Sequence, residues 1–507
     1  MMTITKSNYI SCKQCEKLLW LEKYKPHVLD DKVTKQTAEG DAVGALARMY
    51  YQPNVTVKLD TVEHMAEQTR ALIAAGENII CEATFCVDGL SCAVDILRIY
   101  RSGEAITGVD IIEVKATTSV KDHQVDDVAF QTYVLERDGY RVNRVILMYL
   151  NSNYVRQGGL DVYELFCQED VTVRAKGCVM TAPLIEQARE VLAETAEPDH
   201  ELSLNCERPY ECPAKAYCRQ CKGIPEQSVF SVSGMTAAKK YAFYAQGIVT
   251  LEDLCRRDEL LTKQQAACVR GMRGPMGSAP SVSTENVRRF LDGLQFPLYH
   301  LDFETVQYAI PKYNGTTPYQ QVPFQYSLHI MMSPTGPFIH KEYLADPDED
   351  PRDKLVEQLY HDIPMDVMSM AYNTAFEKMV CRALATQYPE YAEHLRNIAD
   401  NMVDLMIPFR NRWVSTPSMH GSYSIKAVLP ALCGNDPSID YHRLPVVHNG
   451  AEAMAIFADM ADGRIPRDKF ADIRKGLLMY CGLDTLAMVK VLQKLYELIS
   501  QGRRQFK

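Results

Sequence analysis

Residues 301–305 read LDFET and residues 479–488 read MYCGLDTLAM, and these two stretches predict the fold of the C-terminal part of the chain. The first is an apolar strand with Asp302 and Glu304 on one face, because side chains alternate in extended backbone. The second places a tyrosine one helical turn before an aspartate, so both side chains face the same way. Carboxylates that converge from separate elements can hold two divalent cations against a phosphodiester. The chemistry indicated is nucleolytic.

Composition and charge are those of a folded protein with more than one domain. The chain has 507 residues, of which 47% are hydrophobic and 24% charged, and this excludes global disorder. Its length predicts roughly three domains. The net charge of −10 does not indicate nucleic-acid binding, but local basic patches can bind nucleic acid in an acidic chain.

Membrane and targeting signals are not expected. No apolar run approaches the roughly 18 residues that a membrane span requires, and we expect no membrane partner. The N-terminus lacks the pattern of a signal peptide, so a cytoplasmic location is predicted. In that reducing compartment the 16 cysteines are expected to be buried thiols and metal ligands rather than disulfides.

Periodicity predicts an α/β protein built of two α/β domains around a small helical connector. The predicted boundaries are 1–222, 223–290 and 291–507. The connector is more basic than acidic, and its segment 244–254 resembles a helix-hairpin-helix unit, which offers backbone N–H groups to a phosphate. A plain helical linker is the alternative.

The N-terminal domain has a second group of carboxylates. Asp95 lies in the apolar run 93–97, and Glu113 and Lys115 lie on one face of the strand predicted at 111–115. Two such acids can hold a divalent cation, and a lysine beside them can stabilise developing charge. A solvent-facing strand that ends in charges is the alternative, but unpaired charges within apolar runs are costly.

The order of these residues, D…E-x-K after a hairpin turn, resembles the PD-(D/E)XK nucleases, which have a restriction-endonuclease-like fold. Val94 stands where that pattern has a proline. The segment 127–133 resembles the Gln/Tyr motif of RecB-type members, with its tyrosine closer to the glutamine than usual. The resemblance implies metal ligands Asp95 and Glu113, with catalytic or supporting roles for Lys115, Gln131 and Glu82.

Four cysteines resemble the ligand set of the iron–sulfur RecB-like nucleases. Cys206, Cys212 and Cys218 form a C-x5-C-x5-C pattern at the end of the N-terminal domain, and Cys15 lies near its start. That family includes the CRISPR spacer-adaptation nuclease and the bacterial nuclease that resects double-strand breaks. The resemblance implies a [4Fe–4S] cluster that joins the two ends of the domain.

Two alternatives stay open for these thiols. Cys12 and Cys15 form one C-x2-C pair, and Cys218 and Cys221 form another, and two such pairs can bind zinc. Their separation is much longer than in an ordinary zinc ribbon. The thiols can also be unliganded.

Three motifs of the C-terminal domain follow the order found in the DEDDy exonucleases, which have an RNase H-like fold. Asn373 opens the second motif, and Glu377 closes it where the family has aspartate. A longer side chain there changes the geometry of two-metal binding. Asp404 and Lys426 are weaker candidates, the latter for a phosphate contact. The resemblance implies these catalytic residues: Asp302, Glu304, Glu377, Tyr480 and Asp484, with the four acids as metal ligands.

Taken whole, the chain resembles a bacterial family that fuses an iron–sulfur RecB-like nuclease to a DEDD-type exonuclease domain. The resemblance implies a nuclease dependent on Mg²⁺ or Mn²⁺ that acts on nucleic acid, with DNA ends favoured over RNA. Repair or antiviral defence fits, with a helicase or a defence complex as partner. The alternative is a nucleic-acid-binding scaffold with one or both sites inactive. A redox sensor, which would cleave nothing, is a third reading.

Overall fold

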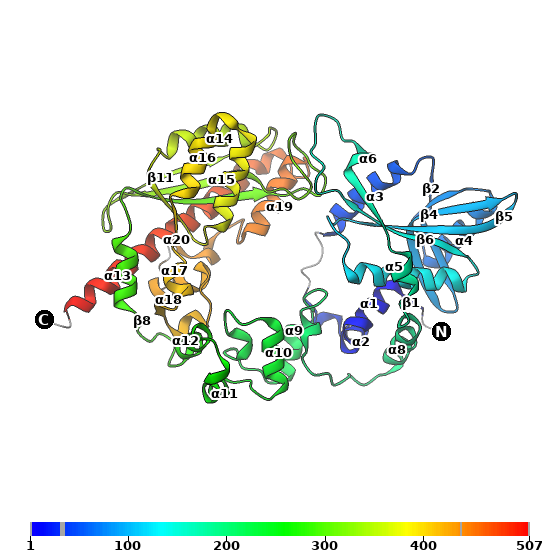
Figure 1. The fold of residues 1–507 in the computed structure, drawn as a ribbon, viewed down its shortest axis with the longest axis horizontal. Coiled ribbons are helices and arrows are strands. Elements are labelled where there is room, and N and C mark those ends of the chain that lie inside the picture. Colours follow the sequence, from blue (N-terminus) through cyan, green and yellow to red (C-terminus); the bar gives the residue numbers. More distant parts are fainter. Residues whose placement is uncertain (1–2, 31–35, 435, 437–438, 505–507) are drawn as a thin grey trace. The chain divides into compact units, whose positions relative to one another are not determined.

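The computed structural model describes residues 3–30, 36–434, 436 and 439–504. The protein is a mixed α/β chain that divides into two compact units, each with a sheet of its own (Figure 1). Unit 1 consists of Met1–Ile224 and Tyr308–Gln320, and unit 2 consists of Pro225–Gln307 and Gln321–Lys507. The connector therefore belongs to unit 2, and a short segment from the later part of the chain belongs to unit 1.

The sheet of unit 1 has seven strands in the order β2-β3-β4-β5-β6-β7, with β1 paired to β4. The strands β3, β4 and β5 form antiparallel hairpins, and Gly103, with φ of 63°, allows the turn between β4 and β5. β5 and β6 are parallel and are joined through α5. The strands are β1 (Ile4–Thr5), β2 (Val55–Thr56), β3 (Ile79–Val87), β4 (Leu90–Ser102), β5 (Ala105–Lys115), β6 (Val142–Leu150) and β7 (Phe166–Asp170).

Both faces of this sheet are covered, so its strands are nearly continuous apolar runs. One face packs on α1, α2, α5 and α8, and the other packs on α3, α6 and the segment 308–320. Tyr319 of that segment donates a hydrogen bond to the carbonyl of Ala116 at 2.7 Å. The helices are α1 (Lys6–Gln14), α2 (Glu16–Tyr24), α3 (Gln36–Tyr50), α4 (Val62–Ala74), α5 (Asp122–Arg137), α6 (Val162–Leu165), α7 (Thr172–Lys176), α8 (Thr181–Ala193) and α9 (Lys215–Cys221).

The main sheet of unit 2 has five strands in the order β11-β10-β9-β12-β13. β9, β10 and β11 are antiparallel, whereas β12 and β13 run parallel to β9. The strands are β9 (Leu298–Val306), β10 (Val322–Met331), β11 (Phe338–Leu344), β12 (Met368–Ala371) and β13 (Met402–Asp404), and a separate pair is formed by β8 (Ser281–Val282) and β14 (Val414–Ser415).

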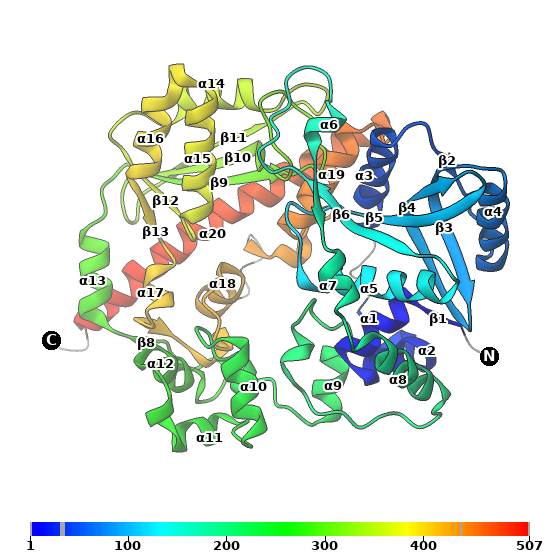
Figure 2. The same cartoon turned by 45° about the vertical axis from the view of Figure 1, so that its right-hand side comes forward.

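Helices cover both faces of this sheet. Figure 2 shows α14, α15 and α16 on one side of the strands and α20 running across the other side. The helices are α10 (Ala237–Ala245), α11 (Leu251–Arg256), α12 (Lys263–Met272), α13 (Thr284–Asp292), α14 (Arg352–Asp362), α15 (Ala375–Gln387), α16 (Ala392–Asp400), α17 (Ile407–Arg410), α18 (Ile425–Cys433), α19 (Gly450–Ala461) and α20 (Phe470–Arg504).

The predicted helical connector contains three of these short helices, α10, α11 and α12. Gly247 lies between the first two with φ of 75°, in the left-handed region that favours glycine. Thr250 then caps α11 through a capping box with Asp253. The resemblance of this turn to a helix-hairpin-helix unit stays a prediction.

Buried polar side chains fix α20 to the sheet. On β10, every second residue from Gln325 to His329 faces this helix. Gln325 donates to the carbonyl of Leu477 at 2.9 Å, and the Thr485 hydroxyl lies 2.6 Å from Ser327 Oγ and 2.8 Å from His329 Nδ1. All of these polar side chains are almost completely buried. Because buried polar groups need their partners, this seam sets the position of α20 along β10.

The length and composition of α20 differ from the expectation that no segment can span a membrane. A helix over Arg467–Gln501 is long and apolar enough to do so by length and composition alone. However, 61% of its most apolar window is buried inside the protein, as in the core helix of a folded domain. Its apolar side chains serve the core of unit 2.

Replacing Thr485 tests the polar seam. Thr485→Val keeps the shape of the side chain but leaves Ser327 and His329 without this partner, at a cost of about 2–3 kcal/mol. We expect thermal unfolding of unit 2 at a Tm several degrees lower, whereas Ser500→Ala, at the exposed end of the same helix, leaves Tm unchanged. An unchanged Tm for Thr485→Val would show that apolar packing alone holds α20.

Candidate active sites and cysteine cluster

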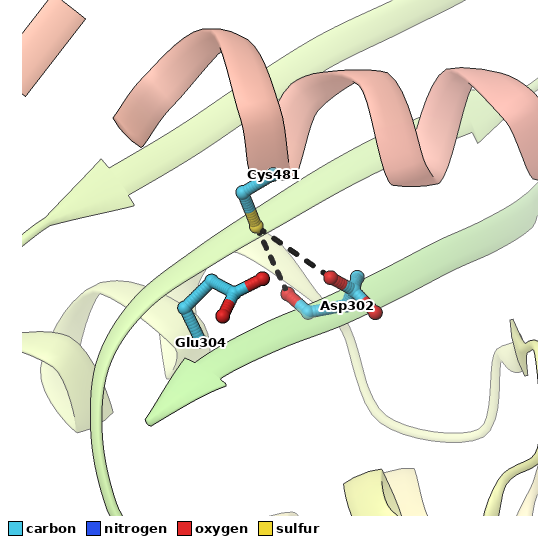
Figure 3. Close-up of side chains that lie close together, drawn as sticks. All are labelled: Asp302, Glu304 and Cys481. Atoms are coloured by element: carbon cyan, nitrogen blue, oxygen red, sulfur yellow. Dashed lines mark hydrogen bonds between the residues drawn. The ribbon is translucent and has the colours of Figure 1, made fainter. Parts of the chain in front are cut away.

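The C-terminal candidate site lies between β9 and α20. Asp302 and Glu304 project from β9 toward the helix, and Cys481 points down from α20 to meet them (Figure 3). Ligand atoms of these three residues lie within 4.8 Å of one another. The Cys481 thiol is 3.7 Å from Asp302 Oδ2 and 3.8 Å from its backbone oxygen. We did not predict Cys481 as a site residue, although it is the neighbour of Tyr480 in sequence.

Four carboxyl groups share this buried space and repel one another. Burial, together with Asp484, Glu304 and Glu377, raises the pKa of Asp302 well above its ordinary value. Burial, Asp484 and Glu377 raise the pKa of Glu304 to about 8, and burial and Asp404 raise that of Glu377 to about 7. Burial raises the pKa of Asp484 to about 6 against the opposing effects of Tyr441, Lys426 and Tyr480. Without added positive charge the group holds protons at neutral pH.

Glu377 lies in the first turn of α15, directly after a sharp bend of the backbone. Asn373 opens this bend with φ of 70°. Asp404 accepts hydrogen bonds from the backbone N–H groups of Asn373 at 3.0 Å and Met406 at 2.9 Å, so it holds the bend in place. Glu377 is 4% exposed, and its Oε2 has no hydrogen-bond partner among the described residues. A buried carboxylate oxygen with an open lone pair suits a metal ion.

Two tyrosines and a lysine surround Asp484. The Tyr441 hydroxyl donates to Asp484 Oδ1 at 2.5 Å. The Lys426 ammonium lies 5.3 Å from the ring centroid of Tyr441 and 5.8 Å from that of Tyr480. Burial and Asp484 raise the pKa of Tyr480 and Tyr441 far above the ordinary value, so both hydroxyls keep their protons. The sequence pattern identified Tyr480 but missed Tyr441, which comes from a loop without a motif.

The N-terminal candidate site lies on β4, β5 and α5 of unit 1. Asp95 accepts a hydrogen bond from the Val114 N–H at 2.7 Å. Glu113, which is 2% exposed, accepts from Gln131 Nε2 at 2.6 Å, and Lys115 Nζ lies 3.0 Å from its other oxygen. The structure thus brings together Asp95, Glu113, Lys115 and Gln131, four of the five residues that we predicted for this site.

Two further charged residues complete the N-terminal site, and the sequence reasoning missed both. Asp127 of α5 binds Lys115 Nζ at 2.5 Å. Lys6, the first residue of α1, binds Glu113 Oε1 at 2.7 Å. No local motif marks Lys6, because more than a hundred residues of chain separate it from Glu113.

The pKa values of Glu113 and Asp95 differ widely. Burial opposes ionisation of Glu113, but Lys115 and Lys6 lower its pKa to about 2. Burial and Glu113 raise the pKa of Asp95 to about 7. Glu113 is therefore ionised at neutral pH, and Asp95 is poised to lose or hold a proton. Charges are largely balanced here, whereas the C-terminal site is strongly acidic.

Glu82 lies beside this site on β3. Its φ of 58° is in the left-handed region, and the pairing with β4 passes it by with the register unchanged, from Cys81–Ile96 to Ala83–Val94. Its carboxylate pairs with Arg48 Nη1 at 3.0 Å. Burial raises the pKa of Glu82, and Glu113 adds to this effect. This fits the supporting role predicted for Glu82.

Segments from both ends of unit 1 meet at the cysteines. Gln14 Nε2 donates to the carbonyls of Asn205 and Tyr210, each at 2.9 Å. Cys15 begins α2, Cys206 ends a 3₁₀ turn, and Cys218 lies on α9. Burial raises the pKa of Cys212 to about 12, and the thiols of Cys206, Cys15 and Cys218 add to the shift. The four thiols predicted as ligands are therefore near neighbours.

Backbone N–H groups lie near two of these thiols. The N–H groups of Leu18 and Lys17 bind the Cys15 sulfur, and that of Ala214 binds the Cys212 sulfur, as backbone donors do around iron–sulfur clusters. Zinc with Zn–S bonds of about 2.3 Å needs thiolates about 4 Å apart. Within the described ranges, no group of three cysteines meets a 4.8 Å limit. Iron–sulfur and zinc both stay predictions for these thiols.

Comparison with known proteins gives a match to a protein family over part of the chain. A family profile described as a domain of unknown function (DUF2779) matches residues 299–424. The matched segment contains Asp302, Glu304 and Glu377 but ends before Tyr480 and Asp484. No curated protein and no solved structure matches the chain.

The raised carboxylate pKa values predict how metal-free stability depends on pH. The pKa of Glu304 rises from 4.5 to about 8, so the folded protein keeps a proton that the unfolded chain releases. Stability in EDTA should therefore fall as pH rises from 4.5 to 8. Glu304→Gln removes this effect, and we expect its Tm at pH 8 to exceed that of the parent by about 3–5 °C.

Two comparisons check this result. Mn²⁺ should raise the Tm of the parent protein but not that of Glu304→Gln, because the amide binds cations poorly. Glu393→Gln, at an exposed position on α16, should behave like the parent. A lower Tm for Glu304→Gln in EDTA at pH 8 would contradict the repulsion described above.

The cysteine cluster is tested by its metal content. Protein purified without oxygen should contain iron and sulfide in amounts matching one [4Fe–4S] cluster and show broad visible absorption. Cys212→Ser should lose most of both, whereas Cys86→Ser, which alters a cysteine of β3 outside the ligand set, should keep them. Zinc without iron in the parent protein would instead support the zinc alternative.

Proposed function

We propose that this protein is a metal-dependent nuclease with two candidate phosphodiesterase sites, one in each unit. On this proposal unit 1 contains a restriction-endonuclease-like domain and unit 2 an RNase H-like exonuclease domain. The observation that carries the proposal is the group of four carboxylates at Asp302, Glu304, Glu377 and Asp484, of which the two glutamates are buried and all four have raised pKa values. Such mutual repulsion is costly unless cations relieve it, and two-metal phosphodiesterases use this arrangement.

In the C-terminal site the four acids would hold Mg²⁺ or Mn²⁺, which polarise the phosphate and activate water. Tyr480 and Tyr441 keep their protons, so each can orient a water or a phosphate oxygen by donating a hydrogen bond. Lys426 can offset charge that develops on the phosphate. Glu377 is one methylene longer than the aspartate of the DEDDy pattern.

In the N-terminal site Asp95 and Glu113 would hold a divalent cation, which again activates water. Lys115 is fixed between Glu113 and Asp127, so its ammonium can stabilise the charge of the attacked phosphate. Gln131 binds both Glu113 and the carbonyl of Ala93, and so keeps the carboxylate pointed into the site. These contacts support the roles that the PD-(D/E)XK resemblance implies.

Cys15, Cys206, Cys212 and Cys218 would hold the [4Fe–4S] cluster. We assign it a structural role, because its ligands come from the two ends of unit 1 and no catalytic step is needed from it. DNA ends are the proposed substrate, with repair or antiviral defence in the cytoplasm as the setting. A helicase or a defence complex is the proposed partner.

A scaffold that binds nucleic acid without cutting it is the second candidate for the C-terminal site. The substitution of glutamate at Glu377 favours it, because two-metal geometry tolerates little displacement. In that case the acids bind cations and nucleic acid, and the N-terminal site or a partner provides the cleavage.

Cleavage assays with one variant in each unit test the proposal. The protein, kept from oxygen, is incubated with end-labelled single-stranded DNA, duplex DNA and RNA in Mg²⁺ or Mn²⁺. We expect Lys115→Ala and Asp302→Ala each to remove the activity of its own site, by about 100-fold or more. Loss in only one variant assigns cleavage to that unit and leaves the other as a binding module. Intact protein that cuts none of the three polymers would refute the nuclease function.

A further inference from the structure

Lys6 occupies a position that helix preferences do not explain. It is the first residue of α1, where the partial positive charge of the helix end disfavours an ammonium group. Its backbone is firmly held: Thr5 caps the helix through a capping box with Asn8, and β1 pairs with β4 at Ile4 and Thr5. Lys6 is therefore fixed to the same sheet that carries Asp95.

The Lys6 side chain reaches into the N-terminal candidate site. Its Nζ lies 2.7 Å from Glu113 Oε1, the oxygen that also takes Lys115 at 3.0 Å. The other oxygen of Glu113 accepts from Gln131 at 2.6 Å. Oε1 is thus engaged by two ammonium groups, which fill its two lone pairs, and a cation can bind this oxygen only if one ammonium group gives way.

Lys6 is better placed to move than Lys115. Lys115 has a second carboxylate partner, Asp127, at 2.5 Å, and its side chain is 19% exposed. For Lys6, Glu113 is the single ion-pair partner found within the described part of the chain, and its side chain is 31% exposed. Lys6 has fewer ion-pair partners and a more exposed side chain than Lys115, so its ammonium is easier to displace from Glu113.

We propose that Lys6 is a further catalytic residue of the N-terminal site. Its ammonium neutralises Glu113 while the site is metal-free, and contacts the scissile phosphodiester once Glu113 binds a divalent cation. The inference rests on the proposed nuclease function of that site. It adds a residue that the D…E-x-K pattern does not contain.

Electrostatic attraction explains why Lys6 contacts Glu113 without metal and why it would contact the phosphate once metal is bound. Without metal, Asp95, Glu113 and Asp127 face Lys6 and Lys115, which nearly balances the site. A dication at Glu113 repels the nearby ammonium, and a phosphodiester brings the negative charge that attracts it. The side chain need only swing from the carboxylate toward the entering phosphate, since its backbone is fixed at the edge of the site.

The test uses Asp302→Ala protein, in which cleavage reports on the N-terminal site alone. Lys6→Met, Lys6→Arg and the control Lys13→Ala, an exposed lysine on the same helix, are made in this background. Mn²⁺ affinity is measured by calorimetry, with Glu113→Gln as the blank for this site, and kcat is measured at saturating Mn²⁺. Circular dichroism checks that each variant is folded.

We expect Lys6→Met to bind Mn²⁺ at least fivefold more tightly, because the Lys6 ammonium no longer competes for Glu113, yet to lose about 100-fold in kcat. Lys6→Arg should keep most of the activity, and Lys13→Ala should match the background in both. Unchanged Mn²⁺ affinity in Lys6→Met, while cleavage still depends on Lys115, would overturn the inference and leave the proposed function standing. No cleavage by any protein, even with tighter Mn²⁺ binding in Lys6→Met, would refute the nuclease function of this site and the phosphate contact together.

Discussion

A group of mutually repelling carboxylates from β9, α15 and α20 is the constraint on which unit 2 depends. The sheet and the helix must each be held firmly enough to keep these groups together, because repulsion in a buried site pushes them apart. The polar seam of Gln325, Ser327 and His329 against α20 supplies this restraint. Thr485, its central partner, is the residue next to Asp484, so the contact that anchors the helix also places a site acid.

The two sites differ in how their acidic side chains are stabilised. In unit 1 lysines stand against the acids, and Glu113 is ionised with its pKa lowered to about 2. In unit 2 the acids outnumber nearby cations, and their pKa values rise instead. A balanced site can persist without metal, whereas a site of like charges is completed by it. On the proposed function, this difference predicts that the two sites depend differently on metal and pH, and that Lys6 and Lys426 have different roles.

Much of each site could be predicted from short stretches of sequence. Two-residue periodicity placed Glu113 and Lys115 on one face, and Asp302 with Glu304 on another, since strands have no alternative. Helical periodicity placed Tyr480 and Asp484 on one face of a helix, one turn apart. Lys6 and Tyr441 escaped prediction because they reach their sites across long stretches of chain and belong to no local pattern. Cys481 was read as part of a motif rather than as a neighbour of Asp302.

The sequence by itself determined the mixed α/β class, the acids within apolar strands and the cysteine spacing, because each depends on residues close together in the chain. The tertiary structure alone decided that segment 308–320 belongs to unit 1 and that Asp404 holds a backbone bend. It also decided which basic side chains lie next to which carboxylates. Those outcomes depend on packing between distant segments, and the charge balance of a buried site is fixed only when such segments meet.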